Sequence, residues 1–257
     1  MQQLPWHKAI EQVLRDNDGV ASLEVLYRDI VKYRDVTTNR EWKATLRGIL
    51  YREMQQKGYI VKVGLGVFAL RSVAPKRTLF QRIVHGKEIK RKHLSHTDIE
   101  GMLVELGNFY GYDTYTADAK KFFDGKPLVS LATLKDLPPF TGFPDLLEQV
   151  RRIDVLWFER KPRAFPKFAF EVETTPDFRR ALLRLYQLRD FDTALYVISN
   201  AAKRNLFEKR LLDEPFHILR HRFVFRSFDD VLNIYQLQVQ LVEEEERFFA
   251  NLIRRRR

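Results

Sequence analysis

The 257-residue chain contains no cysteine. A protein without cysteine has no disulfide, no thiolate nucleophile and no zinc–thiolate site, so these three kinds of chemistry are excluded. Its six histidines are scattered along the sequence, which argues against a structural zinc site. No apolar run approaches the roughly 20 residues of a membrane-spanning helix, and residues 1–6 lack a signal-peptide pattern. We therefore expect a cytoplasmic protein that has no membrane partner.

Positive charge is what the chain has in excess. Lysine and arginine outnumber aspartate and glutamate by 45 to 34, which gives a formal net charge of +11. Such an excess favours an anionic partner, and nucleic acid is the commonest one for a basic protein of this kind. The length and the 45% hydrophobic content suit two modest globular domains.

The first 70 or so residues predict three helices followed by a β-hairpin. One helical run ends near Arg15, and a second extends from Ser22 to about Lys32. Residues 38–41, Thr-Asn-Arg-Glu, have the spacing of a capping box and introduce a third helix with an apolar stripe. Two short apolar strands then flank residues 64–66, Gly-Leu-Gly, as in a glycine-turned hairpin. This order predicts a winged helix-turn-helix.

Residues 1–72 resemble the winged-helix domains of the HARE-HTH type in this order of elements and in the glycine turn. In such domains the third helix enters the major groove of DNA. The non-apolar side of the third helix and the hairpin supply four candidates for contact with double-stranded DNA: Arg40, Lys43, Arg47 and Lys62. Two alternatives stay open, because a charged helix face is often only solvated and winged helices also dock onto proteins.

A basic linker, residues 73–94, is expected after this domain. From residue 71 to residue 93 there are eight lysines and arginines and one acid, Glu88, so eight minus one gives a net charge of +7. We expect either a solvated tether or a segment that follows the DNA backbone, with an affinity that falls as salt rises.

Residues 95–257 predict a second domain of the mixed α/β class. A helix that begins near Ser95 leads into an uncertain stretch, residues 113–150, whose prolines and glycines suggest a long loop or a lid over a site. Residues 153–158 and 168–173 are rich in β-branched and aromatic side chains and predict a β-hairpin. A helix, a buried strand and further helical segments follow.

The predicted hairpin gathers three carboxylates. If it folds about residues 162–163, Asp154 falls opposite Glu171. Glu173 shares a face with Glu171, because strand side chains alternate. Clustered carboxylates repel one another unless they are protonated or bridged by a cation, and their oxygens suit Mg²⁺ or Mn²⁺. The alternative for Asp154 is a simple ion pair with one of the two arginines that precede it.

From residue 95 to about residue 235 the pattern resembles the PD-(D/E)xK nuclease superfamily, the fold of many restriction endonucleases. That family has an acid on its first helix, an Asp at the start of the second strand, and an acid-x-Lys triplet at the end of the third. The corresponding residues here are Glu100, Asp154 and Glu171-Val172-Glu173. Glu173 replaces the usual lysine, Glu105 competes with Glu100, and Asp145 competes with Asp154. The resemblance implies a restriction-endonuclease-like domain with a central mixed sheet.

The resemblance also implies roles for these side chains. Asp154 and Glu171 would bind Mg²⁺, for which Mn²⁺ can substitute, and Glu173 would ligate a second ion or accept a proton from water. Glu100 would orient a metal-bound water from the helix side. Three residues of the following helix are candidates for DNA contact, although they could equally be ordinary surface residues: Arg180, Arg184 and Gln187.

The leading hypothesis is a Mg²⁺-dependent DNA endonuclease of the type II restriction kind, acting as a homodimer so that two sites cut two strands. The alternative is a DNA-binding or regulatory protein whose nuclease-like domain is inactive, which the missing lysine supports. A glycosidase is less well supported, because Glu171 and Glu173 share one strand face and no aromatic sugar cleft is indicated. Asp154→Ala separates the first two hypotheses, since it abolishes cleavage only under the first.

Overall fold

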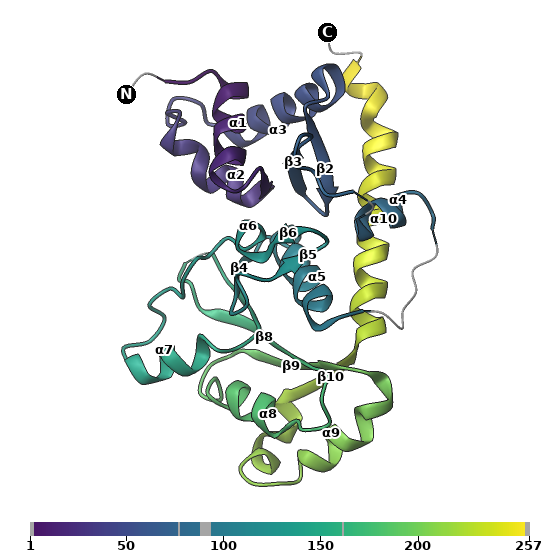
Figure 1. Cartoon of the computed structure of the whole chain (residues 1–257). Helices are drawn as coiled ribbons and strands as arrows, with labels where there is room; N and C mark the ends of the chain where they lie inside the picture. The colour runs from purple at the N-terminus through teal and green to yellow at the C-terminus, as the bar shows by residue number, and fades with distance from the viewer. Residues whose placement is uncertain (1–2, 77, 88–93, 161, 255–257) are drawn as a thin grey trace.

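The first unit of the computed structural model, residues 3–70, combines helices with a small sheet (Figure 1). The structure describes residues 3–76, 78–87, 94–160 and 162–254, with side chains up to residue 248. The elements of the first unit are α1 (Trp6–Asp16), β1 (Val20–Ser22), α2 (Leu23–Asp29), the 3-10 helix η1 (Ile30–Lys32), α3 (Trp42–Arg52), the π-helical turn η2 (Glu53–Lys57), β2 (Ile60–Gly64) and β3 (Val67–Leu70). The strands are antiparallel in the order β1-β3-β2. The three expected helices and the hairpin are present, and β1 is an additional strand.

The start of α3 differs from the expected capping box. Glu41 is the N-cap residue, and its side chain makes no capping hydrogen bond. Asn39 forms the local contacts instead: its Oδ1 accepts the N–H of Glu41 at 3.0 Å, and its Nδ2 donates to Thr45 Oγ1 at 3.0 Å. The prediction of a capping box was wrong because an asparagine side chain that closes a turn on the backbone two residues later competes with it.

The second unit contains a five-stranded mixed sheet in the order β10-β9-β8-β7-β4. Its strands are β4 (Asp113–Thr116), β7 (Val155–Phe158), β8 (Pro166–Glu173), β9 (Ala194–Ser199) and β10 (Phe223–Ser227), and β5 (Phe122–Phe123) pairs separately with β6 (Lys126–Pro127). The pairs β4–β7 and β7–β8 are antiparallel, whereas β8–β9 and β9–β10 are parallel. The predicted α/β class with a central mixed sheet is confirmed.

Helices cover both faces of this sheet (Figure 1). They are α5 (His96–Phe109), α6 (Leu128–Leu131), α7 (Pro144–Val150), α8 (Arg179–Tyr186), η4 (Ala201–Lys203), α9 (Arg204–Arg210), η5 (Phe216–Arg222) and α10 (Phe228–Arg254). Trp157 and Phe170 belong to the core shared with α5 and α10, whereas Leu156 and Ala169 belong to the core shared with α8. Alternate residues of each strand therefore face different helix layers, as the period of two requires.

Residues 113–150 are not the long loop or lid that the sequence suggested. They contain β4, the β5–β6 pair, α6 and α7. Phe123, Leu128 and Leu131 are fully buried in this region. The prolines and glycines separate several short elements there, which is why the sequence pattern had the appearance of one continuous loop.

Part of the expected linker forms a docked helix, α4 (Leu79–Val84). Thr78 and Gln81 form its capping box, and three apolar side chains bury its inner face: Leu79, Phe80 and Ile83. The helix packs against α10 and β2. A solvated tether is therefore the wrong description of residues 78–87, while Arg77 and residues 88–93 lie outside the described residues.

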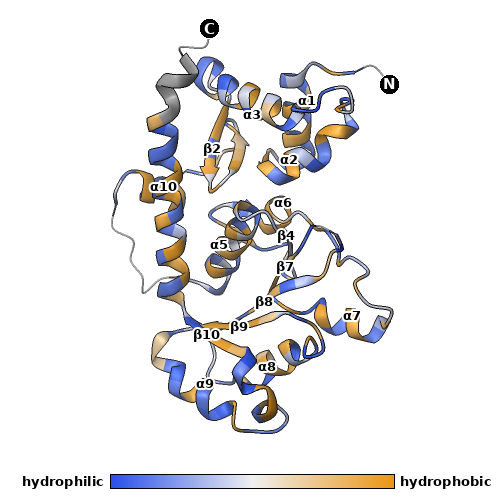
Figure 2. Cartoon of the chain, turned by 180° about the vertical axis from the view of Figure 1, so that it is seen from behind, coloured by the Kyte–Doolittle hydropathy of each residue, from blue (hydrophilic) through white to orange (hydrophobic). Residues whose placement is uncertain are grey.

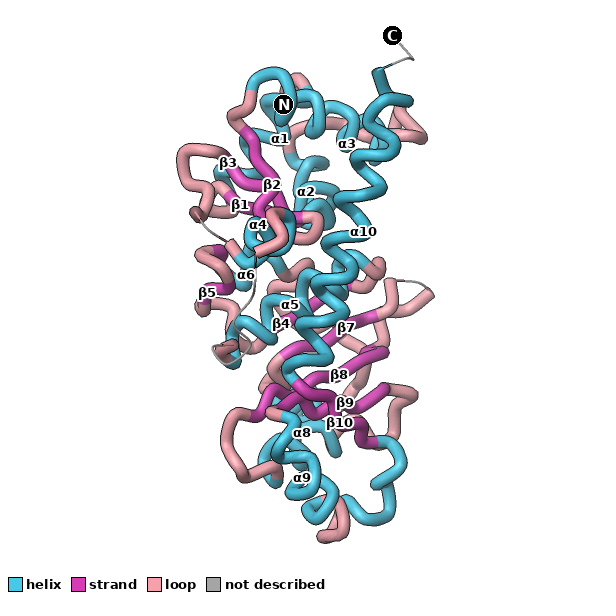
Figure 3. The backbone as a smooth tube through the Cα atoms, turned by 90° about the vertical axis from the view of Figure 1, so that its right-hand side faces the viewer, coloured by secondary structure: helices cyan, strands magenta, loops and turns pink. Residues whose placement is uncertain are grey.

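Helix α10 runs beside both units, from the end of the sheet past α4 to the neighbourhood of α3 (Figures 1 and 3). It carries hydrophobic and hydrophilic residues along its whole described length (Figure 2). At the far end, the hydroxyl of Tyr51 on α3 donates to Glu246 Oε1 at 3.0 Å. None of the described helices combines the length and the apolar character that crossing a bilayer requires.

Candidate active site

The predicted hairpin register is confirmed. Val155 pairs with Phe170 and Trp157 with Phe168, so the extended register sets Asp154 against Glu171. Asp154 lies immediately before β7, and its Oδ2 accepts the N–H of Val172 at 2.7 Å. This hydrogen bond fixes the carboxylate of Asp154 on the neighbouring strand.

Glu100 on α5 lies on the other side of Asp154. A capping box formed by Ser95 and Asp98 fixes the start of this helix, so the residues of its first turns have defined positions. Glu100 is fully buried, and neither of its carboxylate oxygens has a hydrogen-bond partner among the described residues. A buried carboxylate without partners is costly, so this one calls for a ligand that the protein itself does not supply.

His96, one helical turn before Glu100, completes this group. Its Nε2 lies 3.4 Å from Glu100 Oε1 and 3.6 Å from Asp154 Oδ2. One donor atom from each of His96, Glu100 and Asp154 can be chosen so that all three lie within 4.8 Å of one another. The nearest further acid is Asp118, whose Oδ2 lies 3.9 Å from the same nitrogen and which also pairs with Lys121.

Burial dominates the electrostatics of this group. It raises the pKa of Glu100 to about 7, although the neighbouring His96 works in the opposite direction. Burial also raises the pKa of Asp154, against the hydrogen bond from Val172. Burial alone would lower the pKa of His96, but the two facing carboxylates outweigh it and raise this pKa. All three groups therefore hold their protons more tightly than they would in water.

The other two predicted carboxylates have protein partners. Glu171 is fully buried. Arg184 on α8 donates two hydrogen bonds to it, from Nε to Oε1 at 2.6 Å and from Nη2 to Oε2. Burial raises the pKa of Glu171 well above its ordinary range, although Arg184 lowers it. Glu173 is half-buried, and its Oε1 accepts both the N–H and the hydroxyl of Thr175 at 2.7 Å. The structure thus brings Asp154 next to Glu100, and Glu171 next to Arg184.

Sequence reasoning missed His96 and the partner of Glu171. A signal for His96 was available, because residues i and i+4 on a helix lie on one face and His96 precedes Glu100 by four positions. The pairing of Arg184 with Glu171 depends on how α8 packs on the sheet, which the spacing of the two residues does not encode. Glu105, the competitor of Glu100, points into a different buried group with Lys126 at 2.6 Å.

A divalent cation fits the group formed by His96, Glu100 and Asp154. Two buried carboxylates supply the oxygen ligands that such ions prefer, and the oxygens of Glu100 have no competing partner in the described part of the chain. Glu171 could join them where Arg184 releases one of its oxygens. The donor set therefore suits a divalent metal ion.

The predicted DNA contacts fall into two classes. Arg40, Lys43 and Arg47 are exposed at and along α3, as expected. The side chain of Lys62 is only 8% exposed, and its Nζ lies 2.7 Å from carboxylate oxygens of both Glu243 and Glu246 of α10. Its charge is therefore paired with these two glutamates. A residue on the predicted wing was expected to reach DNA, and the packing of α10 against the wing explains the different outcome.

The candidates on α8 also differ from one another. Arg180 is exposed, Arg184 is committed to Glu171, and the side-chain amide of Gln187 donates to the carbonyl oxygen of Leu183 on the same helix at 3.2 Å. Of these three side chains, Arg180 is therefore the one that is exposed and is not engaged by Glu171 or by the backbone of α8.

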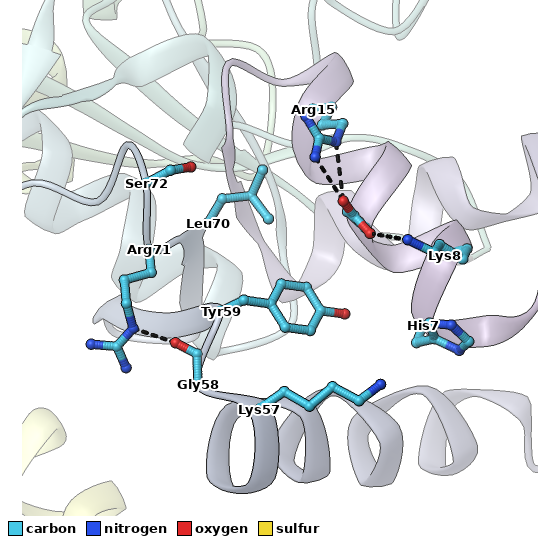
Figure 4. A pocket seen from close by; sticks show the side chains of 10 residues that line it. His7, Lys8, Arg15, Lys57, Gly58, Tyr59, Leu70, Arg71 and Ser72 are labelled. Atoms are coloured by element: carbon cyan, nitrogen blue, oxygen red, sulfur yellow. Dashed lines mark hydrogen bonds and ion pairs between the residues drawn. The ribbon is translucent and has the colours of Figure 1, made fainter.

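A pocket of about 700 Å³ lies in the first unit, away from the carboxylates (Figure 4). Its lining includes Glu11, which accepts hydrogen bonds from Lys8 at 3.1 Å and from Arg15 at 2.7 Å. The charges of Lys8 and Arg15 are therefore paired with the carboxylate of Glu11. The pocket therefore adds nothing to the chemistry of the carboxylate group.

The model of the protein family described as the type II restriction enzyme NmeDI C-terminal domain matches residues 75–251. The match covers more than half of the chain and includes α4, the five-stranded sheet and most of α10. Comparison with curated proteins and with solved structures gave no match.

Proposed function

Because the chain belongs to the family of the type II restriction enzyme NmeDI C-terminal domain, we propose that it is a metal-dependent endonuclease that hydrolyses phosphodiester bonds in double-stranded DNA. The observation that carries this proposal is the buried pair Glu100 and Asp154, in which Glu100 has no hydrogen-bond partner among the described residues. Two buried carboxylates repel each other, and a bound cation converts that repulsion into attraction.

The fold supports a PD-(D/E)xK type of active site. The succession α5, β4, β7, β8, α8, β9 gives a helix, an antiparallel meander, a crossover helix and a parallel strand. Asp154 stands at the start of the second strand of this succession, and Glu171 and Glu173 stand at the end of the third. The family pattern has its carboxylates at these positions.

In the proposed mechanism, Asp154 and Glu100 would hold the ion, and Glu171 and Glu173 lie at the end of the adjacent strand β8. Mg²⁺, or Mn²⁺ in its place, supplies neutralisation of the charge that grows on the phosphate and a bound water of lowered pKa. Glu173 accepts a proton from the attacking water, since it is only half-buried and one of its oxygens is not engaged by Thr175. The N–H of Val172 keeps Asp154 in place throughout.

Arg184 supplies the positive charge that the family pattern has in its lysine. Its guanidinium is held against Glu171, which the extended register places opposite Asp154, and it is half-buried. When a phosphate oxygen arrives, a planar guanidinium can bind the carboxylate and the phosphate with different N–H groups. The absence of lysine at position 173 is therefore compatible with activity.

The first unit is proposed to act as a winged-helix domain that selects the DNA. The exposed cations Arg40, Lys43 and Arg47 lie at and along α3, the helix expected to enter the major groove. Helix α10 packs against α5 and β10 of the second unit and contacts Lys62 and Tyr51 of the first, so it is proposed to set the separation between the recognition helix and the carboxylates.

A homodimer is proposed on the exposed side of α10. Ile234, Leu237 and Leu241 are 42%, 62% and 52% exposed and follow one another at spacings of three and four. That spacing produces an apolar seam on a helix, and a second copy of the same helix is complementary to it. Leu237→Glu should convert a dimer into a monomer in analytical ultracentrifugation, with Glu244→Gln on the same helix as the control.

The experiment that tests the function is cleavage of varied plasmid and genomic DNA, modified and unmodified, in Mg²⁺, in Mn²⁺ or in EDTA. The variant Asp154→Asn keeps the size of the side chain and removes its charge. Asp145→Asn is the matched control, because Asp145 follows Pro144 as in the literal family dipeptide and lies exposed in the first turn of α7.

We expect discrete, metal-dependent fragments from the wild type and from Asp145→Asn, and a loss of at least about 10³-fold with Asp154→Asn. Loss of cleavage in Asp145→Asn alone would transfer the site from Asp154 to Asp145 of the Pro144-Asp145 pair. Tight, salt-sensitive DNA binding without cleavage on any substrate would favour the alternative function, a DNA-binding or regulatory protein with an inactive nuclease-like domain.

A further inference from the structure

The side chain of His96 lies within ion-pair distance of three carboxylates but makes no hydrogen bond of ordinary length to any of them. Its Nε2 is buried and has no hydrogen-bond partner among the described residues. Carboxylate oxygens of three acids surround it at 3.4 Å (Glu100), 3.6 Å (Asp154) and 3.9 Å (Asp118). An N–H···O hydrogen bond has a length of about 2.7–3.2 Å, so all three contacts are too long.

These separations match the spacing of ligands around one metal ion. Metal–nitrogen and metal–oxygen bonds of about 2.0–2.2 Å, set at tetrahedral or right angles, place neighbouring ligand atoms roughly 3 to 3.5 Å apart. The distances from His96 Nε2 to Glu100 Oε1 and to Asp154 Oδ2 are 3.4 Å and 3.6 Å. The imidazole nitrogen therefore lies close to ligand spacing from one oxygen of each carboxylate, and the three donor atoms lie within 4.8 Å of one another.

Glu100 provides the independent observation that a ligand belongs here. Its side chain is fully buried, both of its oxygens lack a hydrogen-bond partner in the described part of the chain, and it faces the same nitrogen. Glu171, by contrast, is engaged by Arg184 with both oxygens. The unsatisfied donor atoms therefore lie on the α5 side of Asp154.

We infer that His96 is a direct ligand of the metal ion, together with Glu100 and Asp154, and that its imidazole makes this site prefer a first-row transition ion such as Mn²⁺ or Co²⁺ over Mg²⁺. Mg²⁺ favours six oxygen ligands in a near-ideal octahedron, whereas imidazole nitrogen is a better ligand for transition ions. The inference rests on the proposed function for its biological meaning, but ion binding can be measured without DNA.

The test is calorimetric titration of the wild type and of His96→Gln with Mn²⁺, Co²⁺ and Mg²⁺. His221→Gln is the matched control. His221 is exposed in η5, more than 100 residues after His96 in the sequence and outside the carboxylate group. We expect the wild type and the control to bind the transition ions at least about tenfold more tightly than Mg²⁺. In His96→Gln the affinity for Mn²⁺ and Co²⁺ should fall at least about tenfold, with little change for Mg²⁺.

A spectroscopic readout makes the test independent of any variant. In the wild type loaded with Mn²⁺, pulsed electron paramagnetic resonance should detect the magnetic coupling of the ion to an imidazole ¹⁴N nucleus. The absence of that coupling, or an unchanged affinity for Mn²⁺ in a folded His96→Gln, would overturn the inference. Thermal unfolding followed by circular dichroism establishes that the variant is folded.

The failure of this inference differs from the failure of the proposed function. Nitrogen-coupled Mn²⁺ in a protein that cleaves no DNA would leave His96 as a ligand and remove the nuclease proposal. Cleavage that depends on Asp154, in a protein whose bound Mn²⁺ shows no nitrogen coupling, would keep the nuclease and exclude His96 from the metal.

Discussion

Helix α5 carries two fully buried glutamates, Glu100 and Glu105, whose surroundings are opposite. Glu105 is surrounded by partners: Lys126 Nζ at 2.6 Å, the N–H of Leu65 at 2.7 Å and the hydroxyl of Tyr235 at 2.6 Å. Glu100 has no hydrogen bond among the described residues. Equal burial therefore says nothing about role, whereas the count of satisfied oxygens does.

The two sites explain each other in physical terms. A buried charge is tolerated when its partner and its hydrogen bonds are supplied, and Glu105 obtains them from β2–β3, β6 and α10, so that it joins the two units. Glu100 has no such partners among the described residues, because its charged neighbours are His96 and the acids Asp154 and Asp118, so its burial costs stability in the metal-free protein. The first arrangement serves stability and the second serves binding.

Removing the carboxylate of Glu105, whose oxygens are satisfied by Lys126, Leu65 and Tyr235, should produce the largest loss of stability. Glu105→Leu leaves the fully buried ammonium of Lys126 without a counter-charge, so we expect the free energy of unfolding to fall by about 3–5 kcal/mol. Urea unfolding of the metal-free protein measures it. Lys126→Met combined with Glu105→Leu should recover most of the loss, because the isolated charge is then gone. A loss below about 1 kcal/mol in the single variant would mean that the pair is not desolvated as the structure has it.

Removing the charge of Glu100, whose oxygens have no hydrogen bond among the described residues, should raise the free energy of unfolding. The pKa of Glu100 is about 7 in the folded protein, against an ordinary 4.5. Between these values the unfolded chain has lost a proton that the folded protein keeps, so stability falls as the pH rises from about 4.5 to 7. Above pH 7 the cost is complete, at roughly 3 kcal/mol.

Glu100→Gln tests this sign directly. In EDTA, the variant should match the wild type near pH 4.5 and exceed its free energy of unfolding by roughly 3 kcal/mol at pH 8. Chemical denaturation at several pH values gives the difference. Parallel pH profiles of the two proteins would show that Glu100 is not held in its protonated form by burial.

The sequence predicted the elements that repeat with a fixed period. The register of β7 and β8 follows from a hairpin turn at residues 162–163, and the structure has that register. The contrast between Glu100 and Glu105 could not be predicted, because both lie on one helix beside the same apolar stripe. The partners of Glu105 come from the β2–β3 turn, β6 and α10, and Asp154 beside Glu100 comes from the start of β7, all of them far away in the sequence. Tertiary packing, which period and spacing do not encode, decides which acid is satisfied.

The same limit explains the errors about Lys62 and the linker. Both were interpreted from local charge, and both are governed by α10, which supplies Glu243 and Glu246 to Lys62 and an apolar surface to α4. A long amphipathic helix at the end of the chain is predictable from its pattern, but the elements that it covers are not.

A metal ion that binds at Glu100 should make this glutamate a source of stability, whereas in the metal-free protein it costs stability. An ion that binds only the folded protein stabilises it by about 2.7 kcal/mol at a concentration of 100 times its Kd. We expect this gain in the wild type and its loss in Glu100→Gln, measured as the shift in unfolding midpoint on adding Mn²⁺ to the metal-free protein. Glu244→Gln, at an exposed position of α10, should keep the whole gain. An equal gain in all three proteins would mean that the ion binds elsewhere.

The smallest change separates the hydrogen bonds of Glu105 from its ion pair. Tyr235→Phe removes one hydroxyl that donates to Glu105 Oε2 at 2.6 Å and leaves the buried ring in place. Because a hydrogen bond to a charged group contributes about 1.5–3 kcal/mol, we expect a loss of about 2 kcal/mol in the free energy of unfolding. The affinity for Mn²⁺ should stay the same, since the hydroxyl belongs to the satisfied site. A loss of ion affinity in Tyr235→Phe would show that the two glutamates on α5 are coupled through the helix, and the distinction between a stability site and a binding site would then have to be given up.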